Sequence, residues 1–555
     1  MSEDISVLIG GKAGDGINQA GLLISRIFSS LGYFIYMDFD HPSLIKGGHN
    51  FCIIRASKKP VGALKEKIDL LIALDNTTVK KHQDKISPDT SIIYNSDLIN
   101  KSRGTGVPAL KIVYEEGGKP VMINSCMIGA FCKSIGLGWN NTKDLLEKEF
   151  PHATDVNLRI SKKGFDAICK NCLQIKKEPD NITFFPVITG NEAIALGLLC
   201  GGIDAYIAYP MSPASGILHF LASKQDDYSI KVIHPEGEIA AILMAEGMAY
   251  AGCKAAVGTS GGGFCLMTEG LSFSGIAEIP IVIVLAQRQS PGTGAPTYSA
   301  QSDLSFALYA GHGEFPRIVI TPSNPKEAFE WSARAVKLSW KYQVPGIIMT
   351  DKTLCESTYT FDIFNTKIDS PYDSPNSEGF SEYKRYKKTE NGISPMAIPP
   401  LKNYAIKVNG KTHDESGLST DDPEELNWLS QKRLAKEKAL KEELENIETV
   451  IISESTDLKN TVVSFGSTVN PCREICDTLK IRCVYPVLLS PFPKEKMKNA
   501  LLGSQNIIVV EDNSTGQLGD LMRCNSIQVN KKILNYTGRQ MSIETLSAKI
   551  EEVLL

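Results

Sequence analysis

The segment IPIVIVLA occupies residues 279–286 and is the longest uninterrupted apolar run near the middle of the chain. Its length suits a buried strand and is far short of a membrane span. Four further apolar segments around it stop at Pro, Ser, Thr or Asp, with helical stretches between them: DAYIAYP (204–210), KAAVGTS (254–260), RIVITP (317–322) and PGIIMTD (345–351). Strands that alternate with helices are typical of a parallel sheet, so residues 185–360 are predicted to form a parallel α/β domain.

The rest of the chain separates into three regions. Residues 1–180 repeat the alternation, which predicts another parallel sheet. Residues 361–450 are polar and close with a long charged helix, predicted to be a surface or bridging element. Residues 451–555 return to α/β. The sequence therefore predicts a multidomain α/β protein with parts at 1–180, 185–360, 361–450 and 451–555.

Composition narrows the class of protein. The 555 residues are 42% hydrophobic and 22% charged, and their net charge of -4 argues against nucleic acid or an anionic membrane as a partner. The opening residues carry no basic segment and lead straight into a strand, so no secretory signal and a cytoplasmic location are expected. The thirteen cysteines are expected to be thiols, and no set of four has the spacing of an iron–sulfur cluster.

A glycine-rich turn, GGKAGDGINQAG (10–21), lies between the first strand and the first helix. Such turns let a phosphate approach the backbone at a helix N-terminus, but the spacing is not that of a dinucleotide-binding motif. Its GDG (14–16) also begins like a motif that binds Mg²⁺ and thiamin diphosphate. The Asn that should complete that motif is missing, so we reject that interpretation.

Three polar loops follow strands of the 185–360 region. Two prolines stiffen YPMSPAS (209–215) around Ser212, three glycines open GTSGGGFC (258–265), and Arg288 emerges directly from the 279–286 strand. The carboxyl ends of parallel strands are where such sheets bind ligands, and a buried Arg usually meets a carboxylate or phosphate. A stiff connection and a structural ion pair are the simpler interpretations. The loops surround one pocket only if their strands are neighbours.

A helix of small and apolar residues, HPEGEIAAILMAEGMAYAG (234–252), begins with two acids, Glu236 and Glu238. An acid at a helix start interacts favourably with the helix dipole, which suffices to explain one of them. A carboxyl on an apolar helix beside Ser212 and Arg288 would face a pocket that could hold a small carboxylate.

Several ordered segments resemble the 2-oxoacid:ferredoxin oxidoreductases. YPMSP looks like the family's YPITP motif, VIHPEGEIAAI (232–242) like the segment that bears its thiamin-activating Glu, and AQRQSPGTGAPT (286–297) like its substrate-Arg loop. Residues 451–555 are similar to its C-terminal, transketolase-C-like domain. Residues 1–180 are similar to its separate gamma subunit. The resemblance covers nearly the whole chain and implies an alpha subunit with a gamma domain fused at its N-terminus.

The resemblance implies an activity and its cofactors. Such enzymes convert a 2-oxoacid (here 2-oxoglutarate, pyruvate or both), CoA and oxidised ferredoxin to acyl-CoA, CO₂ and reduced ferredoxin. It places the pyrimidine ring of thiamin diphosphate on residues 185–360, and Mg²⁺ and a [4Fe-4S] cluster mainly on a separate beta subunit. A heterodimer, or a dimer of heterodimers, is expected. A branched-chain or aryl 2-oxoacid as the substrate, or a non-catalytic scaffold for the beta subunit, stays open as an alternative.

The resemblance also assigns roles to residues. Glu238 matches the position that activates thiamin through its N1' atom, and Ser212 and Arg288 match the positions that contact the 2-oxoacid and its carboxylate. The residues expected to line the cofactor site are Tyr209, Pro210, Met211, Thr259 and Ser260. No metal ligand is expected on this chain. Lys46 could contact the distal end of the substrate or CoA, although a surface lysine is an equal interpretation. Met396 stands where the family commonly has Arg.

Overall fold

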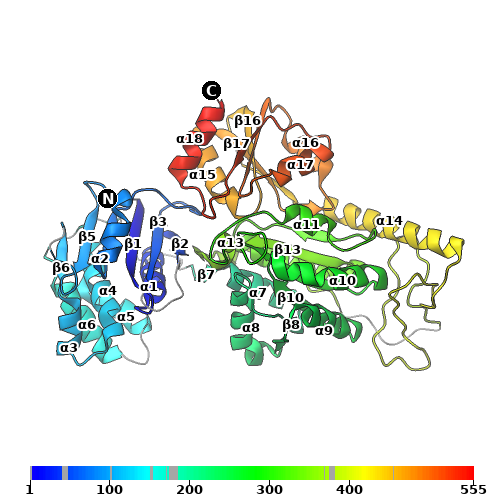
Figure 1. Ribbon diagram of the computed structural model, residues 1–555, viewed down its shortest axis with the longest axis horizontal. Coiled ribbons are helices and arrows are strands. Elements are labelled where there is room, and N and C mark those ends of the chain that lie inside the picture. Colours follow the sequence, from blue (N-terminus) through cyan, green and yellow to red (C-terminus); the bar gives the residue numbers. More distant parts are fainter. Residues whose placement is uncertain are drawn as a thin grey trace. The chain divides into compact units, whose positions relative to one another are not determined.

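The computed structural model of the chain divides into two compact units (Figure 1). Unit 1 comprises Met1–Ile188, Ser357–Ile363 and Met541–Ala548, and unit 2 comprises Thr189–Glu356, Phe364–Gln540 and Lys549–Leu555. The structure describes residues 3–40, 48–100, 103–149, 154–169, 172–173, 175, 185–367, 369–373, 382–453 and 455–554. The finer division of the chain into four regions stays a prediction.

Unit 1 is built on an eight-stranded mixed sheet of order β6-β5-β4-β1-β3-β2-β14-β7. Its strands are β1 (Asp4–Lys12), β2 (Phe34–Asp40), β3 (His49–Ser57), β4 (Leu70–Ala73), β5 (Ser91–Asn95), β6 (Thr105–Val107), β7 (Val187–Thr189) and β14 (Thr358–Thr360). The predicted parallel sheet is only partly right, because β1, β4, β5 and β6 are parallel whereas β3 runs antiparallel to both β1 and β2. The segment between Asp40 and His49 is too short for the crossover helix that a parallel pair requires.

Helices pack against this sheet and bury its apolar residues in the core of unit 1. The helices are α1 (Ile17–Ser30), α2 (Asn76–Lys81), η1 (Gln83–Lys85), α3 (Ala109–Glu115), η2 (Pro120–Met122), α4 (Ile123–Ser134), α5 (Trp139–Glu149), α6 (Thr154–Asp166) and the first part of α18 (Ile543–Leu554). Helices α4 and α6 pack backbone to backbone. A Cβ at Gly129 would lie 1.9 Å from the Ser161 carbonyl oxygen, and one at Gly164 would lie 2.0 Å from that of Cys126. Glycine is therefore required at both positions.

The first sheet of unit 2 confirms the predicted parallel domain. Its order is β18-β12-β13-β11-β10-β8-β9, and only the β12–β18 pair is antiparallel. The strands are β8 (Ala205–Ile207), β9 (Lys231–Ile233), β10 (Ala255–Thr259), β11 (Ile281–Gln287), β12 (Ile318–Ile320), β13 (Pro345–Asp351) and β18 (Leu488–Ser490). The opening segment becomes β11, which is buried along its whole length between β10 and β13.

Helices connect these strands. They are α7 (Gly190–Cys200), α8 (Ser215–Tyr228), α9 (Glu238–Tyr250), α10 (Gly261–Ala277), α11 (Leu304–Tyr309), α12 (Pro325–Tyr342) and α13 (Lys352–Glu356), with η3 (Ile363–Asn365) beyond β14. The start of α12 shows why the chain turns where it does. The Asn324 side chain accepts from the Glu327 N–H, and Pro325 occupies the first helical position, where no donor is needed.

The C-terminal part of unit 2 carries a five-stranded sheet of order β15-β17-β16-β19-β20. Its elements are β15 (Val450–Ile452), β16 (Asp457–Val463), η4 (Gly466–Thr468), α15 (Val469–Leu479), β17 (Ile481–Pro486), α16 (Lys494–Ala500), β19 (Asn506–Glu511), α17 (Gln517–Cys524) and β20 (Lys531–Leu534). The apolar run at 483–489 belongs to two strands, because the chain leaves this sheet at Pro486 and joins the seven-stranded sheet as β18.

The charged helix predicted before this sheet is α14 (Pro423–Glu445). The prediction of a surface or bridging element is incomplete, because one face of α14 is buried and includes Lys432 and Lys436. All thirteen cysteines are free thiols. Among the described residues, no helix is long and apolar enough to cross a membrane, and no group of three or more His, Cys, Asp or Glu could hold a metal ion.

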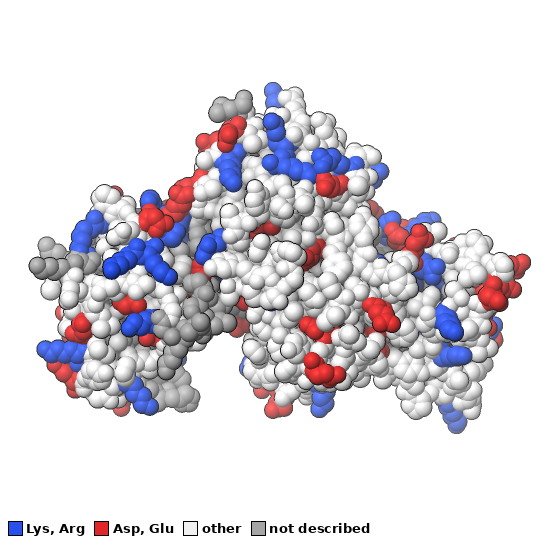
Figure 2. Space-filling view, viewed as in Figure 1, with Lys and Arg blue, Asp and Glu red and all other residues white. Residues whose placement is uncertain are grey.

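Positive and negative side chains are interspersed over the face seen in Figure 2. Lys and Arg number 59 and Asp and Glu 63, so neither sign is in large excess.

Candidate functional site

The three polar loops of unit 2 emerge from adjacent strands. Strand β10 lies between β8 and β11 and is parallel to both. The carboxyl ends of the three strands therefore meet at one edge of the sheet, where α/β proteins bind ligands. The strands that precede the three loops are therefore neighbours, as a single pocket requires.

Glu238 is the first residue of α9 and is 6% exposed, whereas Glu236 is exposed. The carboxyl of Glu238 lies against the first turn of α10. A Cβ at Gly263 would lie 2.5 Å from Glu238 Oε1 and 2.1 Å from Thr259 Oγ1. Only glycine leaves room for both groups, so the glycines of α10 allow a buried acid to reach the end of β10.

Met211 links the first loop to the same turn. The Ser260 hydroxyl donates to Met211 Sδ at 2.8 Å, although Ser260 occupies the N-cap position of α10 and would normally accept from that helix. The first N–H groups of α10 therefore lack a side-chain cap. Gly262 is open: a Cβ there would find only Gly292 O and Met211 Cε, both at 3.8 Å. The turn forms a cradle between the first and third loops.

Arg288 is 8% exposed, and its Nη1 donates to the Ser212 carbonyl oxygen at 2.8 Å. Burial lowers the pKa of its guanidinium. Among the described residues, no carboxylate pairs with Arg288. A buried cation without a counter-ion is costly, so the position favours an anionic ligand.

The structure thus brings together Ser212 with Arg288, Met211 with Ser260, and Thr259 with Glu238. Tyr209, at the rim, is 39% exposed and packs edge-to-face on His234, with ring centroids 6.0 Å apart; Pro210 follows it. Lys46 lies outside the described residues.

Sequence reasoning missed two polar residues beside these loops. Asn191, on α7, is 4% exposed, and its Nδ2 donates to the Pro213 carbonyl oxygen at 2.9 Å, which holds the first loop. Asp303 lies next to the start of α10: a Cβ at Gly261 would lie 2.5 Å from its Oδ2. Burial raises the pKa of Asp303 to about 6. Neither residue stands in a recognisable motif; only its position after a strand or before a helix could have drawn attention to it.

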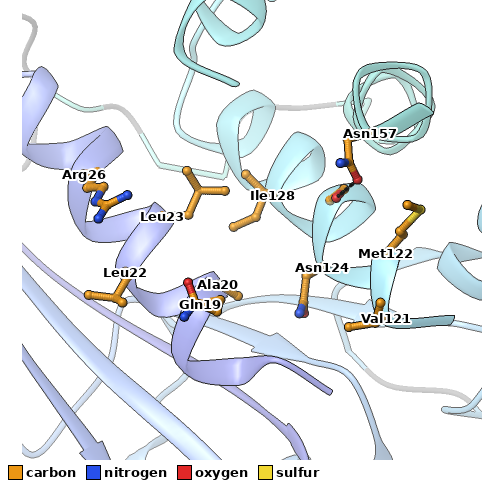
Figure 3. A pocket seen from close by; sticks show the side chains of 11 residues that line it. Gln19, Ala20, Leu22, Leu23, Arg26, Val121, Met122, Asn124, Ile128 and Asn157 are labelled. Carbon is orange, nitrogen blue, oxygen red and sulfur yellow. Dashed lines mark hydrogen bonds between the residues drawn. The ribbon is translucent and has the colours of Figure 1, made fainter. Parts of the chain in front are cut away.

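Unit 1 contains a separate pocket of about 300 Å³ between α1, η2, α4 and α6 (Figure 3). Its apolar lining includes Leu23 and Ile128, and Arg26 and Gln19 stand on α1. Asn124 connects it to the glycine-rich turn, since its Nδ2 donates to the carbonyl oxygens of Asp15 and Gly16 at 2.5 and 3.2 Å. Its own Oδ1 is buried without a partner.

Known proteins match both units. A family model described as "Pyruvate flavodoxin/ferredoxin oxidoreductase, thiamine diP-bdg" matches residues 197–428, and one described as "Pyruvate ferredoxin/flavodoxin oxidoreductase" matches residues 6–167. A 2-oxoacid:ferredoxin oxidoreductase subunit alpha from a Sulfolobus species is 30% identical over 99% of this chain and 96% of its own length. This chain belongs to the 2-oxoacid:ferredoxin oxidoreductase family.

Two further relatives support this membership. A 2-oxoglutarate synthase subunit KorA from Methanothermobacter marburgensis is 29% identical over 64% of this chain and 95% of its own length. The solved 2-oxoglutarate:ferredoxin oxidoreductase from Magnetococcus marinus is 27% identical, and each chain covers 100% of the other with a TM-score of 0.90. The chain is thus an oxidoreductase subunit with the α/β fold of this family, and its thiamin diphosphate-binding part contains the three polar loops described above.

Proposed function

We propose that this chain is the gamma-fused alpha subunit of an enzyme that, with a beta subunit, oxidatively decarboxylates a 2-oxoacid in the presence of CoA and reduces ferredoxin. The observation that carries the proposal is a pair of buried charged groups: the carboxyl of Glu238 and the guanidinium of Arg288, which no carboxylate of the described residues neutralises, lie at one edge of the sheet. The Magnetococcus relative is named as binding 2-oxoglutarate, CoA and succinyl-CoA, which supports 2-oxoglutarate, with pyruvate as the second candidate substrate.

The residues present fit the pyrimidine part of thiamin diphosphate. Gly262 leaves an open cradle, and Glu238 supplies a carboxyl that water barely reaches. When bound, thiamin diphosphate supplies the nucleophilic carbon and the electron sink for decarboxylation. The chain's part is to hold a hydrogen bond from Glu238 to N1', which is strong because the site is dry. Tyr209, Met211 and the hydroxyls beside Glu238 complete the wall around the ring.

Arg288 and Ser212 are proposed to hold the substrate. The guanidinium would form charge-assisted hydrogen bonds with the 2-oxoacid carboxylate, while the Ser212 hydroxyl contacts the acid beside it. The bond from Arg288 to the Ser212 carbonyl oxygen fixes the direction of the guanidinium before substrate arrives. Such preorganisation lowers the cost of binding in the reactive orientation.

The partner is proposed to cover helices α9 and α10, which pack against each other (Figure 1). Their outer faces expose four large apolar side chains, each between 42% and 53% exposed: Ile239, Leu243, Met244 and Leu266. A patch of this kind next to a cofactor site is typical of a subunit interface. We assign it to the beta subunit, which is also proposed to supply the Mg²⁺ and [4Fe-4S] sites that this chain lacks among its described residues.

Expression of this chain with its beta subunit, followed by a 2-oxoacid panel with a viologen acceptor, tests the proposal. Glu238→Gln is expected to lower kcat by about 10²–10³-fold, because an amide cannot replace the carboxyl at N1'. Glu236→Gln, two residues earlier and exposed, is the matched control and should stay within about twofold of wild type. An inactive wild-type complex would support a non-catalytic scaffold instead. Activity restricted to aryl or branched-chain acids would favour that substrate class.

A further inference from the structure

The loop that carries Arg288 is closed on itself. The Asp303 N–H donates to Gln287 Oε1 at 2.9 Å, and the hydroxyls of Ser290 and Ser302 lie 2.9 Å apart. Between these ends, the Gln289 N–H donates to the Tyr298 carbonyl oxygen at 3.0 Å. These hydrogen bonds tie the two ends of residues 287–303 together, so contacts that hold the 298–303 end also influence the position of Arg288.

Gln301 is one of the anchors of this loop. The others include Ser299, whose N–H donates to the Gly538 carbonyl oxygen, and Ser302, whose carbonyl oxygen accepts from Gln517 Nε2.

Gln301 is fully buried, and its amide Nε2 donates to Asp351 Oδ2 and to the Phe465 carbonyl oxygen, both at 3.0 Å. Its Oε1 accepts from the Thr468 hydroxyl at 2.9 Å and from the Asp512 N–H at 3.3 Å. Every hydrogen-bonding direction of the amide is used.

The backbone of Gln301 is held as firmly as its side chain. Its N–H donates to the Asp512 carbonyl oxygen at 2.7 Å, and its carbonyl oxygen accepts from Asn513 Nδ2 at 3.1 Å. Gly466, which has a φ of +57°, leaves the necessary space, since a Cβ there would lie 2.7 Å from Gln301 Nε2. The C-terminal sheet region thus contacts both the backbone and the side chain of Gln301.

Asp351 connects the anchor to the substrate site. It is the last residue of β13 and is paired in register with Gln287, the residue that precedes Arg288. The carboxylate of Asp351 also accepts from the backbone N–H groups of Ser467 and Leu354. Gln301 therefore joins the strand end next to Arg288 to the C-terminal region through rigid, buried contacts.

We propose that Gln301 is a positioning residue for 2-oxoacid binding, which sets the direction of Arg288 by fastening its loop to Asp351 and to the C-terminal sheet region. This inference rests on the proposed function. The hydrogen bonds of the Gln301 side chain within the described part of the chain go to Asp351, Phe465, Thr468 and Asp512 and not to Arg288, so Gln301 acts through the loop. Removal of its amide leaves Asp351 short of a donor in a buried site and releases the loop.

The test uses the full chain co-expressed with its beta subunit. Gln301→Leu is expected to raise the KM for 2-oxoacid about tenfold, the equivalent of one misdirected hydrogen bond, and to leave the KM for CoA within about twofold. Hydrogen exchange of amides in 288–303 should become faster. The control is Gln343→Leu, which removes another buried glutamine, bound to Arg385 and the Ser394 carbonyl oxygen. It should lower stability without changing either KM.

Gln301→Glu gives a second measurement that does not depend on a folded Leu variant. Its new oxygen would face Asp351 Oδ2, so the glutamic acid must hold a proton to donate there. The KM for 2-oxoacid should approach the wild-type value at low pH and rise with pH. Equal changes in both KM values, no change in either, or a Gln343→Leu effect of the same size would overturn the inference. An inactive wild-type complex would overturn the proposed function. An active wild-type complex with any of the results above would overturn only the positioning role of Gln301.

Discussion

Replacement of Glu278 by Gln is expected to destabilise unit 2 strongly, because Glu278 neutralises two buried lysines. Its Oε1 lies 2.6 Å from Lys432 Nζ and its Oε2 lies 2.9 Å from Lys436 Nζ, and the three side chains are 6%, 1% and 2% exposed. Burial alone would raise the pKa of Glu278, but Lys436, Lys432 and Arg385 outweigh it and hold that pKa well below its usual range.

The magnitude follows from what the lysines must do without the carboxylate. Burial already lowers the pKa of Lys432 to about 8 in the folded wild type, and without the counter-charge of Glu278 a buried ammonium loses its proton near neutral pH. The Gln carbonyl oxygen can accept from one of the two lysines, which limits the total loss. We expect a loss of about 3–5 kcal/mol, the range for a buried ion pair that loses one partner, and a fall in Tm on the order of 10 °C.

Thermal unfolding and hydrogen exchange along α14 measure this loss. The control is Glu442→Gln on the same helix, whose partner Lys438 is 79% exposed; it should cost less than about 0.5 kcal/mol. The deficit should also depend on pH. In the variant, the unfolded chain binds more protons than the folded one, so its deficit should shrink by about 1.4 kcal/mol per pH unit for each neutral lysine between pH 7 and 8. Above pH 8 the deficit should level off for Lys432, because burial lowers its pKa to about 8 in the folded wild type as well. Equal losses in the two variants, or a deficit independent of pH, would refute the reasoning.

Three further predictions concern other parts of the chain. Arg288→Ala should raise the KM for 2-oxoacid about 100-fold in steady-state assays and leave that for CoA nearly unchanged, because only the acid's carboxylate meets the guanidinium; equal effects on both would contradict this role. Asn124→Ala should speed hydrogen exchange in residues 13–17 about tenfold, since two hydrogen bonds to Asp15 and Gly16 are lost, whereas the exposed Asn140→Ala should not. Burial raises the pKa of Glu246 to about 8, so its stabilising contribution is present below its usual range near 4.5 and is lost as pH rises through 8. Glu246→Gln should therefore gain about 2–4 kcal/mol relative to wild type between pH 5 and 9, measured by unfolding, and no gain would show that the carboxyl is solvated.

The sequence predicted the parallel sheet of unit 2 because its strands are buried on both faces and read as continuous apolar runs. The same pattern misled in unit 1, where β3 is also largely buried but runs antiparallel. Strand direction depends on connection length and partner, which an apolar run does not encode. The burial of Lys432 and Lys436 escaped prediction for a related reason: on sequence they belong to a charged helix, and only the carboxylate of Glu278, 154 residues before Lys432, makes their burial possible.

Within the candidate site, the residues that sequence could single out share one property. Each lies at a strand-to-helix connection, where an unusual polar residue shows in the local pattern: Arg288 directly follows β11, Glu238 begins α9, and Ser212 lies in the loop between β8 and α8. Gln301 and Asn191 were missed because their role lies in contacts with distant segments. Gln301 reaches Phe465 and Asp512, and no local periodicity shows that a glutamine thirteen residues after Arg288 is buried.

Two buried polar side chains, Gln301 and Arg288, differ in how well the described protein groups satisfy them, and this difference indicates where a ligand is expected. Gln301, although fully buried, spends every donor and acceptor on the protein itself, as a structural polar group must. Arg288 is nearly as buried, yet its neighbours in the described part of the chain offer it one carbonyl oxygen and no carboxylate. A buried guanidinium without a counter-ion is unstable, so we expect another molecule to supply the anion that neutralises Arg288. Because Glu238 lies beside Thr259 at the end of β10, and Arg288 follows the neighbouring strand β11, we expect that anion and the ring proposed to bind Glu238 to meet at the same edge of the sheet.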